Sequence, residues 1–255
     1  MVFVILFIFG LAIGSFLNVV ALRYDGEHFV FDSKMIGGRS HCPHCKKTLE
    51  WFELFPLFSF LFLRGKCRTC NARIGFQYPL VEFLSGLIFA FVPLVFGVSN
   101  TAAISASALW ILIFETLLLI SYIDIRLGII PDELNVFLGI VGIFFLIFFG
   151  GPLSWEGHIV GALFGAGFFL ALVLATRGRG MGMGDVKLAA PIGFLFGWPE
   201  ILLLTAASFV LGAVFGIALI AFDKKTMKAS VPFGPFLAIA AVIIFFFGPA
   251  ILRLY

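Results

Sequence analysis

The chain has 255 residues, of which 62% are hydrophobic and only 12% are charged, and its mean hydropathy is +1.14. Soluble globular domains carry about 25% charged residues, so this composition excludes a soluble domain and predicts an all-α polytopic membrane protein. The net charge of +3 says little by itself, and we expect no nucleic-acid partner.

Eight apolar stretches approach the length of about 20 residues that a helix needs to cross a bilayer. We therefore expect about eight transmembrane helices, the first without the basic start of a removable signal peptide. The sixth stretch is short, so we expect it to be tilted, or broken and partly buried in protein. The stretches are residues 2–22, 79–98, 102–123, 134–150, 158–175, 186–198, 200–222 and 233–251.

Lysines and arginines divide unequally between the two sides that these helices would create. Sixteen of the seventeen fall on one side, including nine in residues 23–78 and three in residues 223–232. The positive-inside rule assigns that side to the cytoplasm and places the N-terminus outside. The predicted organisation is a first transmembrane helix at 1–22, a cytoplasmic loop domain at 23–78 and a seven-helix membrane domain at 79–255.

The loop domain contains two Cys-x-x-Cys pairs, Cys42 with Cys45 and Cys67 with Cys70, separated by 21 residues. This spacing is typical of a site in which four thiolates hold Zn²⁺ tetrahedrally. A pair of disulfides is the alternative, but the cytosol keeps thiols reduced. A closed four-cysteine site has no open position, so we expect a structural metal rather than a catalytic one.

Between the cysteine pairs, residues 51–63 form an apolar and aromatic segment that is too short to span a membrane. We expect a hydrophobic hairpin that packs on the helix bundle or lies in the membrane interface. A wall against which an apolar helical substrate docks is a second interpretation, compatible with the first.

Two aspartates stand out among the acidic residues in apolar surroundings. Asp124 ends the third predicted span and Asp185 begins the sixth, so both are expected near the cytoplasmic boundary. Carboxylates a few Å apart share one proton, and such a pair can hydrolyse a peptide bond. Gly182 and Gly184 leave room for a substrate backbone. The alternatives are a helix N-cap for Asp185 and a surface ion pair with Arg126 for Asp124.

The other carboxylates of this part of the chain have plainer interpretations. Asp132 and Glu133 follow Pro131 and are expected to be N-terminal helix charges. Glu82 and Glu115 would be polar links between helices, although Glu82 is also a candidate for recognising a substrate amine.

The sequence Gly182-x-Gly184-Asp185 resembles the signature of GxGD intramembrane aspartyl proteases. Further motifs, in order along nearly the whole chain, narrow the resemblance to bacterial type IV prepilin peptidases. They are Gly14-Ser15-Phe16-Leu17-Asn18-Val19-Val20 with Arg23, the four-cysteine loop, Tyr78-Pro79-Leu80-Val81-Glu82, Asp124-Ile125-Arg126 with Ile130-Pro131-Asp132, and Pro232-Phe233-Gly234-Pro235-Phe236.

This resemblance implies an enzyme of the bacterial inner membrane that removes the basic leader of type IV prepilins or pseudopilins on the cytoplasmic side. It implies that Asp124 and Asp185 are the catalytic pair and that the four cysteines hold zinc. It also implies N-methylation of the new N-terminal amine with S-adenosylmethionine. No residues that would bind this cofactor can be identified from the sequence, because the alternating glycines of residues 178–184 do not form a dinucleotide-binding fingerprint.

Two other functions stay open at this point. One is a GxGD protease that acts on other membrane helices. The other is a transporter whose carboxylates bind cations or protons, with the cysteine loop as a zinc sensor. Transporter sites usually lie near the bilayer midplane, whereas both aspartates are expected at one boundary, which favours the peptidase.

Overall fold

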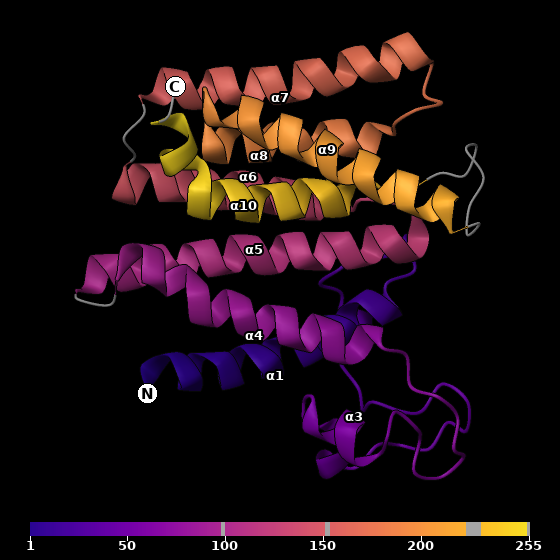
Figure 1. Cartoon of the computed structure of the whole chain (residues 1–255). Helices are drawn as coiled ribbons and strands as arrows, with labels where there is room; N and C mark the ends of the chain where they lie inside the picture. The colour runs from indigo at the N-terminus through magenta and orange to yellow at the C-terminus, as the bar shows by residue number, and fades with distance from the viewer. Residues whose placement is uncertain (98–99, 151–153, 223–230, 254–255) are drawn as a thin grey trace. The chain divides into compact units, whose positions relative to one another are not determined.

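The computed structural model describes residues 1–97, 100–150, 154–222 and 231–253. The chain divides into two compact units, unit 1 (Met1–Leu119) and unit 2 (Ile120–Tyr255). Within the described ranges all regular structure is helical (Figure 1), so the all-α prediction is confirmed. The three-part organisation predicted from the sequence stays a prediction.

The helices follow the apolar stretches closely, because hydropathy alone decides where a chain crosses a bilayer. The elements are α1 (Val2–Arg23), α2 (Ser33–Ile36), the 3-10 helix η1 (Trp51–Leu54), α3 (Phe58–Phe62), α4 (Gln77–Phe96), α5 (Thr101–Leu127), α6 (Asp132–Phe149), α7 (Trp155–Thr176), α8 (Met183–Phe196), α9 (Glu200–Ala221) and α10 (Gly234–Leu252).

Seven described helices are long and apolar enough to cross a membrane: α1, α4, α5, α6, α7, α9 and α10. The predicted sixth span is α8, which has 14 residues and is not among the seven. It is one helix without a break, although it contains Pro191, and most of its residues are buried. The prediction that this stretch is short and partly buried in protein is confirmed for α8, whereas the alternative of a broken helix is not. Within the described residues, the predicted eight spans correspond to seven long helices and this short one.

In unit 1, α1 packs along α4 at very close range (Figure 1). Gly10 and Gly14 of α1 make this approach possible, because a Cβ on either would lie 2.7 Å from α4 backbone atoms. The Ser85 hydroxyl donates to the Gly10 carbonyl at 2.6 Å across the same contact. A small-x-x-x-small pair with an interhelical hydrogen bond is a common way to join membrane helices.

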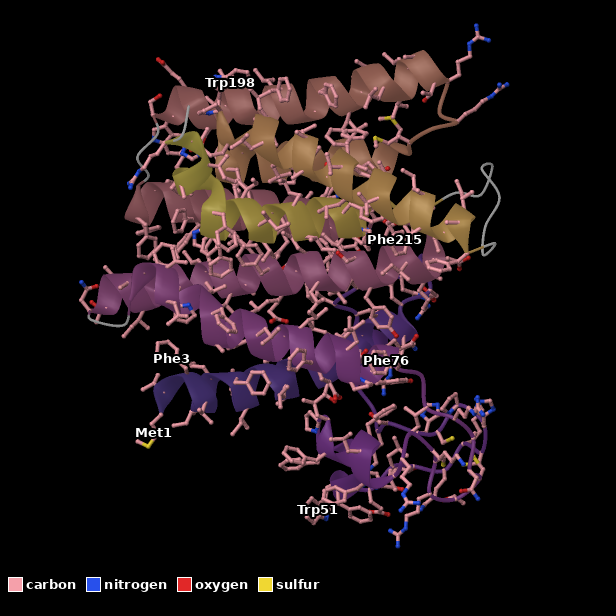
Figure 2. All side chains as sticks on the ribbon, in the orientation of Figure 1. Met1, Phe3, Trp51, Phe76, Trp198 and Phe215 are labelled. Carbon is pink, nitrogen blue, oxygen red and sulfur yellow. The ribbon has the colours of Figure 1, made fainter. Side chains whose placement is uncertain are left out.

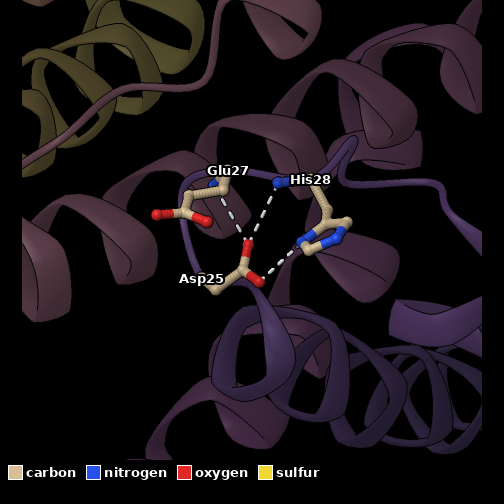
Figure 3. A network of polar contacts seen from close by, with 3 residues as sticks. All are labelled: Asp25, Glu27 and His28. Carbon is tan, nitrogen blue, oxygen red and sulfur yellow. Dashed lines mark hydrogen bonds and ion pairs between the residues drawn. The ribbon is translucent and has the colours of Figure 1, made fainter.

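The end of α1 is tied to the loop that follows it. The Arg23 guanidinium donates to the carbonyls of Gly37, Gly38 and Arg39. In the intervening turn the Asp25 carboxylate accepts the backbone N–H groups of Glu27 and His28 and also contacts the His28 ring at 2.7 Å (Figure 3). These backbone hydrogen bonds lower the pKa of Asp25, so the turn is held by an ionised carboxylate at neutral pH.

In unit 2, α7 packs against α8 through glycines. A Cβ on Gly161 would lie 2.3 Å from the Gly193 carbonyl oxygen, and a Cβ on Gly165 would lie 2.6 Å from that of Ala189. The His158 side chain adds a contact of 2.7 Å between its Nδ1 and the Phe194 carbonyl. This close packing fixes α8, and with it the helix start that carries Asp185.

Candidate active site and metal centre

Asp124 lies near the end of α5 and is buried, with an exposed fraction of only 5%. Its Oδ2 accepts the backbone N–H of Gly234, the first residue of α10, at 3.0 Å. A Cβ on Gly234 would lie 2.8 Å from the same oxygen, so only glycine allows this approach without moving the carboxylate. The predicted alternative, a surface ion pair of Asp124 with Arg126, does not fit a buried side chain.

Asp185 lies in the first turn of α8 and is also buried. The N-cap of α8 is Gly182, and the Asp185 Oδ2 accepts the Gly182 backbone N–H at 3.2 Å. The alternative that Asp185 is itself the N-cap is therefore wrong by three positions, although its side chain does satisfy a free N–H at the helix start.

Both carboxylates lie in unit 2, Asp124 near the end of α5 and Asp185 in the first turn of α8. Each accepts one backbone N–H, from Gly234 and Gly182 respectively. Such donors orient a carboxylate while leaving its remaining oxygen lone pairs available for a substrate or water. The sequence hypothesis needs one acid from each of these two helices, and their role as a catalytic pair stays a prediction.

The two glycines predicted to contact substrate lie around Asp185. A Cβ on Gly184 would meet Ile130 at 3.3 Å, which is a tight contact, whereas the nearest atom for Gly182 is the Asp185 carboxylate at 3.8 Å. Gly184 therefore has a packing role against Ile130, and the space near Gly182 is less restricted. Substrate contact by either glycine stays a prediction.

Asp132 begins α6 after Pro131, as the interpretation of a helix N-terminal charge predicts. Its carboxylate also forms an exposed ion pair with the Lys187 ammonium group of α8, at 2.6 Å. The pair ties the start of α6 to the first turns of α8. The predicted basic loop with Lys224, Lys225 and Lys228 lies outside the described residues.

The four predicted cysteine ligands converge in unit 1. Their sulfur atoms all lie within 4.8 Å of one another, and those of Cys42 and Cys70 are 3.8 Å apart. Four sulfurs that each lie about 2.3 Å from a tetrahedral ion are about 3.8 Å apart, so the cluster fits a metal ion. Backbone N–H groups of Cys70 and Thr69 lower the pKa of the Cys67 thiol to about 6, which favours the thiolate that a metal needs.

The two cysteine pairs repeat one backbone motif at an offset of 25 residues. In each, the first cysteine N–H donates to the carbonyl five residues later, of Lys47 or Ala72, at 2.9 or 2.8 Å. The residue after the second cysteine, Lys46 or Asn71, has a positive φ of 59° or 56°. Two equivalent knuckles therefore each present two sulfurs. This repeat was not predicted, although the matching spacing of the two cysteine pairs indicates it.

A cavity of about 530 Å³ lies in unit 1 between this loop, the end of α1 and the start of α4. Its lining includes the carboxylates of Glu53 and Glu82, the Arg23 side chain and the rings of Tyr78 and Phe60. The predicted substrate contact Glu82 thus faces this cavity, and its Oε2 accepts the Leu57 backbone N–H at 2.8 Å. Pockets for small ligands have volumes of about 300–1,000 Å³ with a few polar groups among apolar walls.

The fold and these sites define a polytopic membrane protein with two buried aspartates in unit 2 and a cluster of four cysteines that could hold a metal ion. Comparisons with known proteins agree with that class. The family model described as the Bacterial Peptidase A24 N-terminal domain matches residues 8–96, and that of the Type IV leader peptidase family matches residues 111–217. No solved structure matches the chain.

Several curated relatives are similar over nearly their whole length. A protein of Bacillus subtilis is 34% identical over 98% of this chain and 96% of its own length. Proteins of Aeromonas hydrophila and Pseudomonas aeruginosa are each 33% identical, over 99% and 96% of this chain and 93% and 90% of their own lengths. All three are named prepilin leader peptidase/N-methyltransferase. The chain belongs to the type IV leader peptidase family.

Proposed function

We propose that the chain is a membrane aspartic endopeptidase that removes the leader of type IV prepilins or pseudopilins and then N-methylates the new N-terminus. Asp124 and Asp185 are the catalytic pair. The observation that supports this assignment is the burial of one carboxylate on α5 and one on α8 in the same unit, each oriented by one backbone N–H. Curated relatives with both activities in their names support it.

Hydrolysis needs one ionised and one protonated carboxylate, which a close pair provides by sharing a proton. The ionised acid takes a proton from water as the water oxygen bonds to the scissile carbonyl carbon. The protonated acid donates its proton to the carbonyl oxygen. The C–N bond then breaks as the hydroxyl proton returns to the second acid and the first acid passes its proton to the leaving amine. The Gly234 and Gly182 N–H groups keep both carboxylates facing the substrate.

The metal of the four-cysteine centre is zinc, held by Cys42, Cys45, Cys67 and Cys70. Its role is structural, because four thiolates fill the tetrahedral coordination. Removing it leaves two knuckles whose sulfurs no longer share a ligand, so we expect the loop domain to lose its fold.

The methyl donor is S-adenosylmethionine, and its binding site is the 530 Å³ cavity beside the cysteine loop. When bound, it supplies an electrophilic methyl group to an amine. The donor carries two positive centres and one carboxylate, and the cavity offers Glu53 and Glu82 for the former and Arg23 for the latter. Glu82 also favours a substrate ammonium group close by.

The protein lies in the bacterial inner membrane with the cysteine loop and the aspartate pair on the cytoplasmic side and its N-terminus outside. The distribution of lysine and arginine supports this orientation. A prepilin is a helix held in the same bilayer, so its cleavage site lies at the depth of the two aspartates. Gly182 and Gly184 are proposed to border the bound substrate backbone.

The test is to incubate the purified, reconstituted protein with a prepilin and S-adenosylmethionine and to measure product masses. We expect loss of the leader mass and gain of one methyl group. Asp124→Asn and Asp185→Asn should each abolish cleavage, whereas Glu156→Gln, an exposed carboxylate in the first turn of α7, should cleave normally. Full cleavage by either aspartate variant would refute the assignment. Equal cleavage of membrane helices without a basic leader would indicate a broader protease.

A further inference from the structure

The apolar segment between the cysteine pairs exposes large side chains that neither its own fold nor the rest of unit 1 covers. We call residues 51–63 the aromatic hairpin; it contains η1 and α3. Trp51 is 76% exposed, Leu61 69% and Phe62 82%. Other exposed apolar side chains of the hairpin are Phe52, Leu54, Phe55 and Phe58. Figure 2 shows Trp51 at the outer edge of the hairpin. Contiguous exposed apolar surface of this kind marks an interaction site.

Hydrogen bonds hold the hairpin in one defined conformation, so its exposed apolar surface is part of the fold. Leu57 at its turn has a positive φ of 59°, a strained value for this residue type. The Leu57 N–H donates to Glu82 of α4 at 2.8 Å, which holds the turn against that helix. Glu53, buried inside the hairpin, accepts the Glu50 N–H at 2.9 Å.

The contact with Glu82 also sets the depth of the hairpin. Glu82 is the sixth residue of α4, which begins at Gln77, so it lies about 8 Å along the helix from that end. Amphipathic segments in a membrane interface bury their apolar side about 5–10 Å into the headgroup and acyl boundary. The hairpin turn therefore lies beside α4 at the depth of that boundary.

Two further features favour lipid over a protein partner. The side chains of Leu80, Phe83 and Leu84 on α4, within a turn of Glu82, are also exposed, so further apolar surface lies at the depth of the hairpin turn. Exposed cations follow the hairpin directly at Arg64, Lys66 and Arg68. Cations at this position attract anionic headgroups, while tryptophan favours the interface.

We propose that the aromatic hairpin inserts into the interface of the leaflet next to the cysteine loop, and that anionic lipid is its partner. The Arg68 guanidinium lies 5.4 Å from the centre of the Phe52 ring, so charge and apolar surface meet at one edge of the hairpin. The insertion anchors the cysteine loop at the membrane surface. It does not depend on the peptidase assignment.

Tryptophan fluorescence tests this insertion in the full-length protein. Wild type and Trp51→Phe are reconstituted in phosphatidylcholine and phosphatidylglycerol vesicles, and the difference between them isolates Trp51 emission. The lipids carry bromine either near the headgroup or near the chain end. We expect shallow bromine to remove most of the Trp51 emission, deep bromine to remove little, and aqueous iodide to have a small effect.

A second pair of variants controls for any structural change that the substitution at position 51 itself causes. Phe62→Trp in the Trp51→Phe background places the indole at the other exposed end of the hairpin and should give the same depth profile. Thr69→Trp, exposed on the second cysteine knuckle, should respond to iodide and not to bromine. Absence of bromine quenching at both hairpin positions in the protein alone overturns the proposal. Three outcomes without bromine quenching would each overturn it: iodide quenches the rings, a second copy of the chain covers them, or quenching changes only when a prepilin is added.

Discussion

Replacing Gly234 by alanine tests whether the α10 backbone orients Asp124, the proposed catalytic carboxylate. The added Cβ would lie 2.8 Å from the Asp124 Oδ2, against the 3.4 Å or more of an ordinary contact. The carboxylate must rotate away and lose the 3.0 Å hydrogen bond from the Gly234 N–H. A hydrogen bond to a charged group contributes about 1.5–3 kcal/mol. If this stabilisation is lost at the transition state, the rate of cleavage falls about 10- to 150-fold.

The assay measures prepilin cleavage by mass at several substrate concentrations, so that kcat and KM separate. A positioning role predicts a fall in kcat with KM nearly unchanged. Gly216→Ala is the matched control, because a Cβ there on α9 meets nothing within 4 Å. Melting temperatures in detergent check that both variants fold. A folded Gly234→Ala protein with the wild-type kcat would refute the reasoning.

Three further predictions concern the metal, the helix packing and the methyl-donor cavity. Wild type should contain about one zinc per chain, and Cys42→Ser should retain almost none by metal analysis, since one closed site needs all four thiolates; undiminished zinc would contradict this. Gly161→Val should lower the melting temperature strongly because its Cβ would lie 2.3 Å from the Gly193 oxygen, whereas Gly167→Ala meets nothing within 4 Å and should melt normally. Glu82→Gln can still accept the Leu57 N–H, so it should slow methylation and leave cleavage intact; equal loss of both would indicate a structural role.

Hydropathy was sufficient to predict the long helices, because burial in lipid requires continuous apolar sequence. The cluster of four cysteines was also predictable, since thiols at metal spacing are rare. Acids in apolar surroundings are equally rare and indicated Asp124 and Asp185, whose catalytic role stays a prediction. The close packing of α1 on α4 through Gly10 and Gly14 was not predicted, although two small residues four positions apart are a packing signal in membrane helices.

Other parts of the site had no local signal. Gly234 meets Asp124 across 110 residues of sequence, and no periodicity indicates which distant backbone N–H a carboxylate will accept. The start of α8, with Gly182 as its N-cap, could not be predicted either, because the alternating glycines allow a helix to begin at several positions. The cavity beside Glu82 depends on how the cysteine loop folds over α1 and α4, which no pattern along the chain describes.

The length of α8 affects the bilayer around it. Fourteen residues extend about 21 Å, whereas the hydrocarbon core is about 30 Å thick. If its end at Phe196 reaches one interface, the end with Asp185 stops about 9 Å short of the other. A local dimple of thinned membrane would compensate for this shortfall, and hydrolytic water would then reach the peptide bond without a dedicated channel through the protein.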